Sequence, residues 1–115
     1  MHKREWKFFI FDISDSVNKI LRFVSDLNRR DFFSDDKTFD AVMRNLEIIG
    51  EAAKKIPADI KEKYAEIEWK KIAGLRDIVV HEYFGIDEDI IWDVIENKIP
   101  ELKENIEKII KYLER

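Results

Sequence analysis

The sequence predicts an all-α protein, an antiparallel bundle of four long helices and a short one. Glycine and proline are scarce, with 3 Gly and 2 Pro in 115 residues, whereas a β-sheet would need turn residues every few positions. Apolar residues also recur at alternating steps of three and four along most of the chain, which places them on one face of a helix. The short connections between these stretches favour antiparallel packing.

The first helix is expected from about residue 4 to residue 28. Its apolar stripe consists of Trp6, Ile10, Ile13, Val17, Ile20, Val24 and Leu27. The segment from Asn28 to Asp36 interrupts the pattern and is predicted to be a connection. Ser34 is the expected N-cap of the next helix, with Asp35 and Asp36 in the first turn, where carboxylates complement the helix dipole.

The second helix has an apolar face of its own, formed by Phe39, Val42, Leu46, Ile49, Ala53 and Ile56. Pro57 ends this helix, because the residue before a proline is pushed out of helical geometry. Gly50 lies inside it and costs about 1 kcal/mol relative to alanine, so we expect another helix to approach closely there. A short helix is expected from Pro57 to about Tyr64.

The rest of the chain is predicted to form two further long helices. One begins near Trp69 and continues into the segment RDIVVHEY, residues 76–83, with Gly85 as a natural stop. The other opens on the acidic run 87–89, and Pro100 is expected to kink or split it. Its apolar face comprises Ile91, Ile95, Ile99, Leu102, Ile106, Ile109 and Leu113.

Length, composition and charge limit the class of protein. Residues 1–115 are expected to form one domain around one core. The sequence has no cysteine, which excludes disulfides and thiolate metal sites. The net charge of −4 argues against broad coating of nucleic acid, although it does not exclude a local basic cleft.

The apolar runs are far shorter than the ~20 residues of a membrane span. The first residues lack the cleavage site of a signal peptide, so we expect a cytoplasmic protein. Plentiful Lys and Glu, with no Gln, are typical of proteins from hot environments.

The segment RDIVVHEY holds the strongest candidate for chemistry. His81 lies near the end of a helix, with Arg76 five residues earlier and Tyr83 two residues later. Arginine is permanently cationic and can bind a phosphate with two hydrogen bonds, whereas histidine titrates near neutral pH and can move a proton. Together they suit phosphodiester chemistry, in which a proton leaves one oxygen as negative charge builds on the phosphoryl group.

Helical geometry sets a condition on such a site. Arg76 and His81 are about 140° apart around a regular helix, so they do not share a face. Asp77 and His81 do share one, which places Asp77 to orient the imidazole. A site that uses Arg76 and His81 together therefore needs a distorted helix end or a second subunit.

Spacing alone favours a purely structural interpretation of the same residues. In that interpretation Arg76 pairs with a neighbouring carboxylate, His81 packs at a helix end and Tyr83 belongs to the core.

Other candidate sites are weaker. Glu47 and Glu51 lie one turn apart, but a di-metal helical site needs a Glu-x-x-His pattern on two helices, which this sequence lacks. The acidic run 87–89 lacks the spacing of a calcium loop, and no P-loop or nucleophile elbow occurs. We therefore expect no metal and no cofactor. Paired surface cations are usually solvated, which is the interpretation favoured for Arg29–Arg30, Lys54–Lys55 and Lys70–Lys71.

The segment RDIVVHEY resembles the signature of the HEPN superfamily, which is an arginine, a polar residue, a short spacer and a histidine. Arg76, Asp77 and His81 match it, although asparagine is frequent where Asp77 stands. Tyr83 matches the tyrosine that the HepT-like toxin branch carries two residues after the histidine. The resemblance spans most of the chain, through AVMRNLEIIGEAAKKIP (41–57), IEWKKIAGLRDIVVHEYFGID (67–87) and IIWDVIENKIPEL (90–102).

The resemblance implies a homodimeric bundle in which the Arg–His motifs of both protomers meet at a cleft. It implies metal-independent cleavage of RNA, tRNA or mRNA, by an endoribonuclease or RNA-end nuclease. His81 would act as general acid or base, and Arg76 would stabilise charge on the phosphoryl group.

Family members are paired with a minimal nucleotidyltransferase antitoxin, in a type VII-like toxin–antitoxin system. The antitoxin can adenylylate the motif tyrosine, which is Tyr83 here. One alternative is a non-catalytic module that binds nucleotide or RNA and partners a nucleotidyltransferase. Another is a structural dimerisation bundle in which the motif serves only packing.

Overall fold

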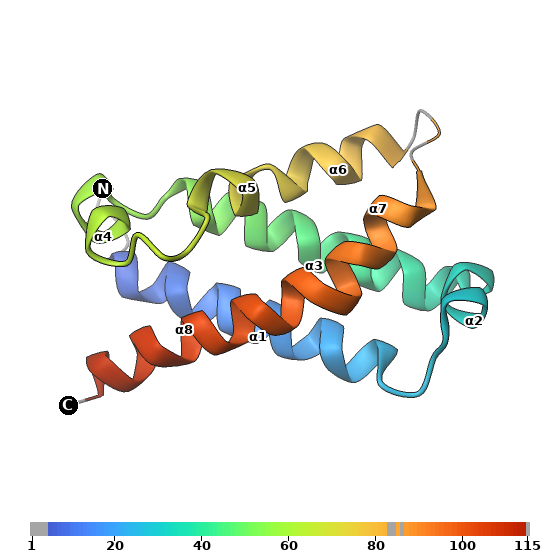
Figure 1. The fold of residues 1–115 in the computed structure, drawn as a ribbon, viewed down its shortest axis with the longest axis horizontal. Helices are drawn as coiled ribbons and strands as arrows, with labels where there is room; N and C mark the ends of the chain where they lie inside the picture. Colours follow the sequence, from blue (N-terminus) through green and yellow to red (C-terminus); the bar gives the residue numbers. More distant parts are fainter. Residues whose placement is uncertain (1–4, 83–84, 86, 115) are drawn as a thin grey trace.

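Four long helical segments run up and down the long axis of the molecule (Figure 1). The computed structural model describes residues 5–82, 85 and 87–114. In chain order its elements are α1 (Trp6–Val24), α2 (Arg29–Ser34), α3 (Asp36–Lys54), α4 (Ala58–Lys63), α5 (Trp69–Ala73), α6 (Leu75–Glu82), α7 (Glu88–Asp93), the π-helical turn η1 (Val94–Lys98) and α8 (Ile99–Leu113). The described residues contain no strand, and the predicted all-α bundle is confirmed.

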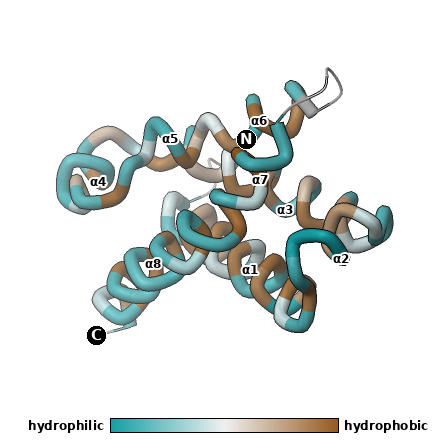
Figure 2. Tube along the Cα trace, turned by 45° about the vertical axis from the view of Figure 1, so that its right-hand side comes forward, coloured by the Kyte–Doolittle hydropathy of each residue, from teal (hydrophilic) through white to brown (hydrophobic). Residues whose placement is uncertain are grey.

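The core lies where α1 packs against α3 and against α8. Hydrophobic and hydrophilic residues alternate along α1 and α8 (Figure 2), as expected of helices that bury one face. The predicted apolar stripes supply most of the residues that solvent does not reach at all, among them Ile10, Ile13, Ile20, Val42, Leu46, Ile49, Ile91, Ile99 and Ile109.

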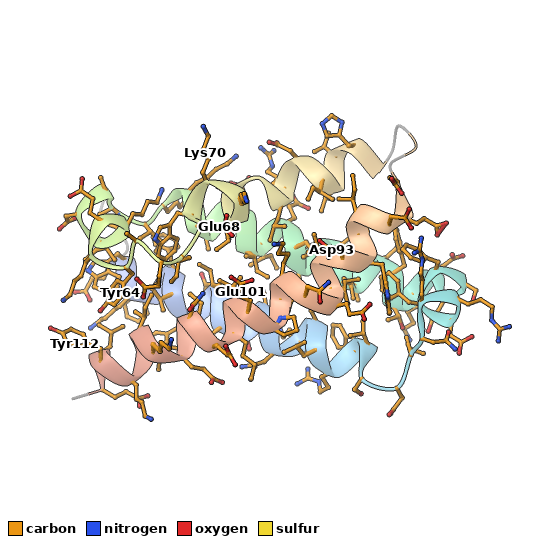
Figure 3. All side chains as sticks on the ribbon, viewed as in Figure 1. Tyr64, Glu68, Lys70, Asp93, Glu101 and Tyr112 are labelled. Carbon is orange, nitrogen blue, oxygen red and sulfur yellow. The ribbon has the colours of Figure 1, made fainter. Side chains whose placement is uncertain are left out.

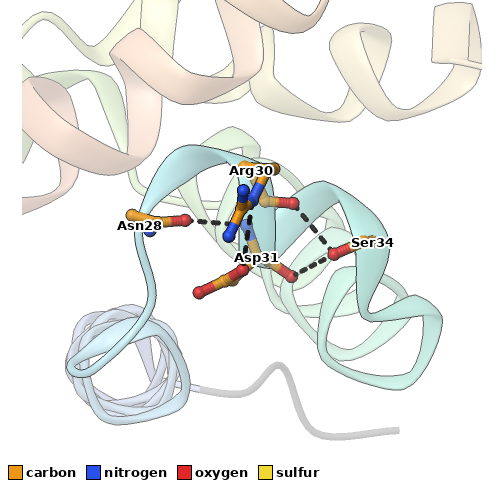
Figure 4. A network of polar contacts seen from close by, with 4 residues as sticks. All are labelled: Asn28, Arg30, Asp31 and Ser34. Carbon is orange, nitrogen blue, oxygen red and sulfur yellow. Dashed lines mark hydrogen bonds and ion pairs between the residues drawn. The ribbon is translucent and has the colours of Figure 1, made fainter.

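The predicted connection between the first two long helices is wrong in one respect, because part of it forms the short helix α2. The Asn28 side chain caps α2 by accepting a hydrogen bond from the Asp31 backbone N–H at 2.8 Å (Figure 4). Phe32 is fully buried, with its ring 5.8 Å from that of Trp92. A six-residue helix has too few turns to show a periodicity, so the sequence pattern missed it.

The predicted N-cap of α3 is also wrong by one residue. Ser34 belongs to the end of α2, where its hydroxyl donates to the Arg30 carbonyl at 2.9 Å. Asp35 caps α3 instead, accepting from the Thr38 hydroxyl at 2.8 Å and from the Thr38 backbone N–H at 3.2 Å. These hydrogen bonds favour the ionised carboxylate and hold the pKa of Asp35 below its ordinary value.

Glycine and proline divide the last two long segments. The helix predicted from Trp69 is interrupted at Gly74, which separates α5 from α6, because glycine has no side chain to favour helical geometry. The final helix splits as predicted at Pro100, where the wider turn η1 precedes α8. A proline removes one helical hydrogen bond and crowds the carbonyl four residues earlier, and a π-helical turn accommodates both.

The second and third long segments approach most closely at Gly50. A Cβ atom placed on Gly50 would lie 2.9 Å from the Arg76 backbone nitrogen and 3.1 Å from the Ala73 carbonyl oxygen. Only a hydrogen atom fits between the two backbones, so the close approach expected at this glycine is confirmed. Gly50 therefore fixes where the first turn of α6 rests on α3.

We predict that Gly50→Ala destabilises the protein by about 1–3 kcal/mol, because the new methyl group forces α6 away from α3. The loss should exceed the gain of about 1 kcal/mol that alanine brings to a helix interior. Urea unfolding followed by circular dichroism measures the change. Gly74→Ala is the control, since Gly74 has a φ of −71° and its nearest contact would be 3.3 Å. A Gly50→Ala protein as stable as the wild type would contradict the close packing.

Candidate functional site

The helix α6 carries three of the four predicted site residues. Arg76, Asp77 and His81 all have exposed side chains, and Tyr83 lies outside the described residues. The helix is regular α-helix from Leu75 to Glu82, so Arg76 and His81 remain about 140° apart around its axis. The described part of α6 therefore lacks the distortion that a site within one protomer would need.

Arg76 forms an ion pair with Glu51 of the neighbouring helix α3. The Arg76 Nε atom lies 2.7 Å from Glu51 Oε1, and the two side chains are 46% and 44% exposed. This is the carboxylate pairing that the purely structural interpretation anticipates. The bond uses only Nε, and no other hydrogen bond or ion pair within the described part of the chain reaches the guanidinium. Its two terminal nitrogens can therefore still donate to another oxyanion.

His81 occupies the last turn of α6. Among the described residues, no hydrogen bond or ion pair joins Asp77 to His81. The side chain of His81 is therefore free to turn toward a bound molecule or a second protein chain. The orienting role of Asp77 stays a prediction.

An apolar groove of about 450 Å³ runs beside the motif helix. It separates α5 and α6 from α7, η1 and α8, and Figure 3 shows Glu68 and Glu101 on its opposite sides. Ile90, which is part of the groove lining, is 47% exposed. The sequence pattern missed the groove because its walls come from segments far apart in the chain. Its apolar lining includes Ile67, Ile72, Leu75, Ile78, Ile90, Val94, Ile99 and Leu102.

Paired charges border this groove. The Lys71 ammonium lies 2.7 Å from the Glu68 carboxylate. Their hydrogen bond lowers the pKa of Glu68 and raises the pKa of Lys71. Lys98 and Glu101, on the other side of the groove, reinforce the two shifts. Glu68 therefore faces the opposite charge of Lys98 in η1, and Lys71 faces that of Glu101 in α8.

Most of the weaker candidates form ion pairs on the surface. Glu47 pairs with Arg44 at 3.7 Å, so both carboxylates considered for a metal pair are matched with arginines. Arg29 forms an ion pair with Asp89 and lies over the Phe33 ring. In the part of the chain that the structure describes, no group of three or more His, Cys, Asp or Glu side chains could hold a metal ion. None of the described helices is long and apolar enough to cross a membrane.

Comparison with known proteins identifies a family and several relatives. A family model described as ribonuclease HepT-like matches residues 13–109. A Methanocaldococcus jannaschii protein, named as a candidate RNase, is 46% identical over 114 residues, which cover 99% of this chain and 98% of that protein. A Thermococcus cleftensis protein, named a probable ribonuclease HepT, is 42% identical over 109 residues, 95% of this chain and 99% of that protein.

A third relative, a candidate RNase of Caldanaerobacter subterraneus, is 43% identical over 88 residues, 76% of this chain and 79% of that protein. These relatives come from thermophiles, in line with the amino-acid composition. No solved structure matches the chain.

Proposed function

This chain belongs to the HepT-like ribonuclease family, and on that basis we propose that it is a metal-independent ribonuclease toxin using Arg76 and His81. The observation that carries the proposal is the exposure of both side chains on α6, in the segment that resembles the family motif. Arg76 has terminal nitrogens available for a phosphate, and His81 is accessible for proton transfer.

The chemistry is transfer of a phosphoryl group within RNA. The ribose 2′-oxygen attacks phosphorus, the bond from phosphorus to the 5′-oxygen breaks, and one proton moves at each of these oxygens. His81 acts as general acid or base at one of them, and Arg76 stabilises the negative charge that builds on the phosphoryl oxygens.

The regular geometry of α6 supports a site shared between two protomers. Because Arg76 and His81 point in different directions from one helix, the arginine of one protomer is proposed to meet the histidine of its partner. The apolar groove and the exposed Val80 lie along the same helix, where a second copy would cover apolar surface.

We predict that the wild-type protein cleaves RNA in the presence of EDTA. His81→Ala should lower the rate by about 10²- to 10⁴-fold, and Arg76→Ala by about 10²- to 10³-fold. Gel analysis of an RNA pool measures both, and circular dichroism controls for folding. If the wild type binds RNA without cleaving it, the proposed enzyme is contradicted and the non-catalytic binding module is supported.

We predict a homodimer at micromolar concentration in sedimentation or light scattering. Mixing the inactive Arg76→Ala and His81→Ala proteins should restore a fraction of the activity, since a mixed dimer contains one composite site with both groups intact. Either variant alone is the control. A strictly monomeric wild type, or a mixture of the two variants as inactive as each variant alone, would contradict the proposal of a shared site.

The proposed cellular partner is a minimal nucleotidyltransferase antitoxin that adenylylates Tyr83. AMP on the tyrosine would add negative charge and bulk two residues along the chain from His81, which opposes RNA binding. Incubation with the cognate nucleotidyltransferase and ATP should add one AMP to the wild type and none to Tyr83→Phe, as read by mass spectrometry. Modification at another residue, or an unchanged mass of the wild type, would rule out this regulation.

A further inference from the structure

We infer that Glu51 is a positioning residue for Arg76, so that α3 contributes a second part of the active site through the adjacent residues Gly50 and Glu51. The inference rests on the proposed role of Arg76 in RNA cleavage. It concerns how the guanidinium is presented, and it assigns Glu51 no contact with the reacting atoms.

The geometry of the ion pair fits a positioning role. Glu51 Oε1 accepts from Nε at 2.7 Å, and Nε lies on the inner edge of the guanidinium. The group is planar, with its donors in a fixed fork, so a short bond at Nε restricts the orientation of the whole plane. The outer edge, which has the two terminal nitrogens, stays available to bind a phosphate bidentately.

Gly50, next to Glu51, packs against the backbone of Arg76. The Arg76 backbone nitrogen would lie 2.9 Å from a Cβ at Gly50, and the Arg76 Cβ would lie 3.1 Å from it. Gly50 thus determines where the side chain of Arg76 begins, and Glu51 determines where it ends. Two consecutive residues of α3 therefore restrict a long side chain that is 46% exposed and would otherwise sample many rotamers.

The exposure of the pair argues against stability as its main role. Ion pairs between side chains this accessible to water add little to the free energy of unfolding. The Glu51 carboxylate also repels an incoming phosphate, so it does not serve affinity for RNA. Removing its charge should therefore leave binding intact or slightly stronger, while the loss of orientation slows the chemical step.

The chain offers a matched control on the same helix. Glu47 lies one turn before Glu51, and it pairs with Arg44 at 3.7 Å. Glu47→Gln removes the same charge from α3, at a comparable exposure of 38%, without touching Arg76. A general effect of net charge on RNA affinity would appear equally in Glu47→Gln and Glu51→Gln.

The test compares kcat and KM for cleavage of a short RNA by the wild type, Glu51→Gln, Glu51→Ala and Glu47→Gln. We expect Glu51→Gln to lower kcat by at least about tenfold, with KM unchanged within about threefold and unfolding unaltered. Glu47→Gln should keep the wild-type kcat. Adding Glu51→Gln to Arg76→Ala should cause no further loss, because Glu51 acts through Arg76.

Two outcomes would overturn the inference while leaving the proposed function intact. In the first, Glu51→Gln keeps the wild-type kcat while Arg76→Ala is inactive. In the second, adding Glu51→Gln to Arg76→Ala lowers kcat by the same factor as Glu51→Gln lowers it in the wild type. An Arg76→Ala protein as active as the wild type, or a wild type that does not cleave RNA, would overturn the proposed function and the inference together.

A spectroscopic readout tests the bond without activity. In the wild type, the Arg76 Nε–H group should give a resolved ¹⁵N-correlated NMR signal that exchanges slowly with water. The signal should broaden or shift to the position of free arginine in Glu51→Gln and stay unchanged in Glu47→Gln. A wild-type signal already at the position of free arginine would show that Glu51 does not hold the side chain, and would contradict the inference.

Discussion

The contact between α3 and the start of α6 at Gly50 is the constraint on which the candidate site depends. Backbone meets backbone there, because a Cβ would lie 2.9 Å from the Arg76 nitrogen. This packing brings Glu51 within reach of the Arg76 guanidinium. A larger residue at position 50 would separate the helices and move the arginine away from its carboxylate. Packing within the bundle and presentation of the site therefore depend on one small residue.

The side chains of Arg76 and His81 are exposed on the regular helix α6. Arg76 has its anchor on α3, whereas His81 stands exposed at the last turn of the same helix. Because about 140° separates the two side chains, a single protomer presents the two groups on different faces. The proposed dimer follows from this separation. The open apolar groove on the other side of α6 means that the motif helix is packed against α3 and less completely against α7 and α8.

An ion pair at the candidate arginine is compatible with both interpretations of the motif. The structural interpretation treats the Glu51–Arg76 pair as the whole role of Arg76, while the functional one treats it as preparation of the guanidinium for a phosphate. The atom that Glu51 contacts favours the second, because a bond at Nε leaves the bidentate edge of the fork unused. A carboxylate on the terminal nitrogens would have blocked that edge.

The sequence by itself determined the class of fold and most of the long helices, and it predicted the segment that carries the candidate site. The apolar periodicity, Pro57 and Pro100 act locally. Spacing along the chain was therefore enough to predict the helices and the breaks at these two prolines. The short helix α2 was missed because six residues are too few to show a periodicity, and the packing of Phe32 against Trp92, 60 residues later in the chain, cannot be seen in local spacing. Only the tertiary structure decided that Glu51 pairs with Arg76, since nothing local relates residues 25 positions apart on different helices. The groove likewise exists only once α5 and α6 lie opposite α8, because burial and cavities are properties of packed helices and not of any one of them.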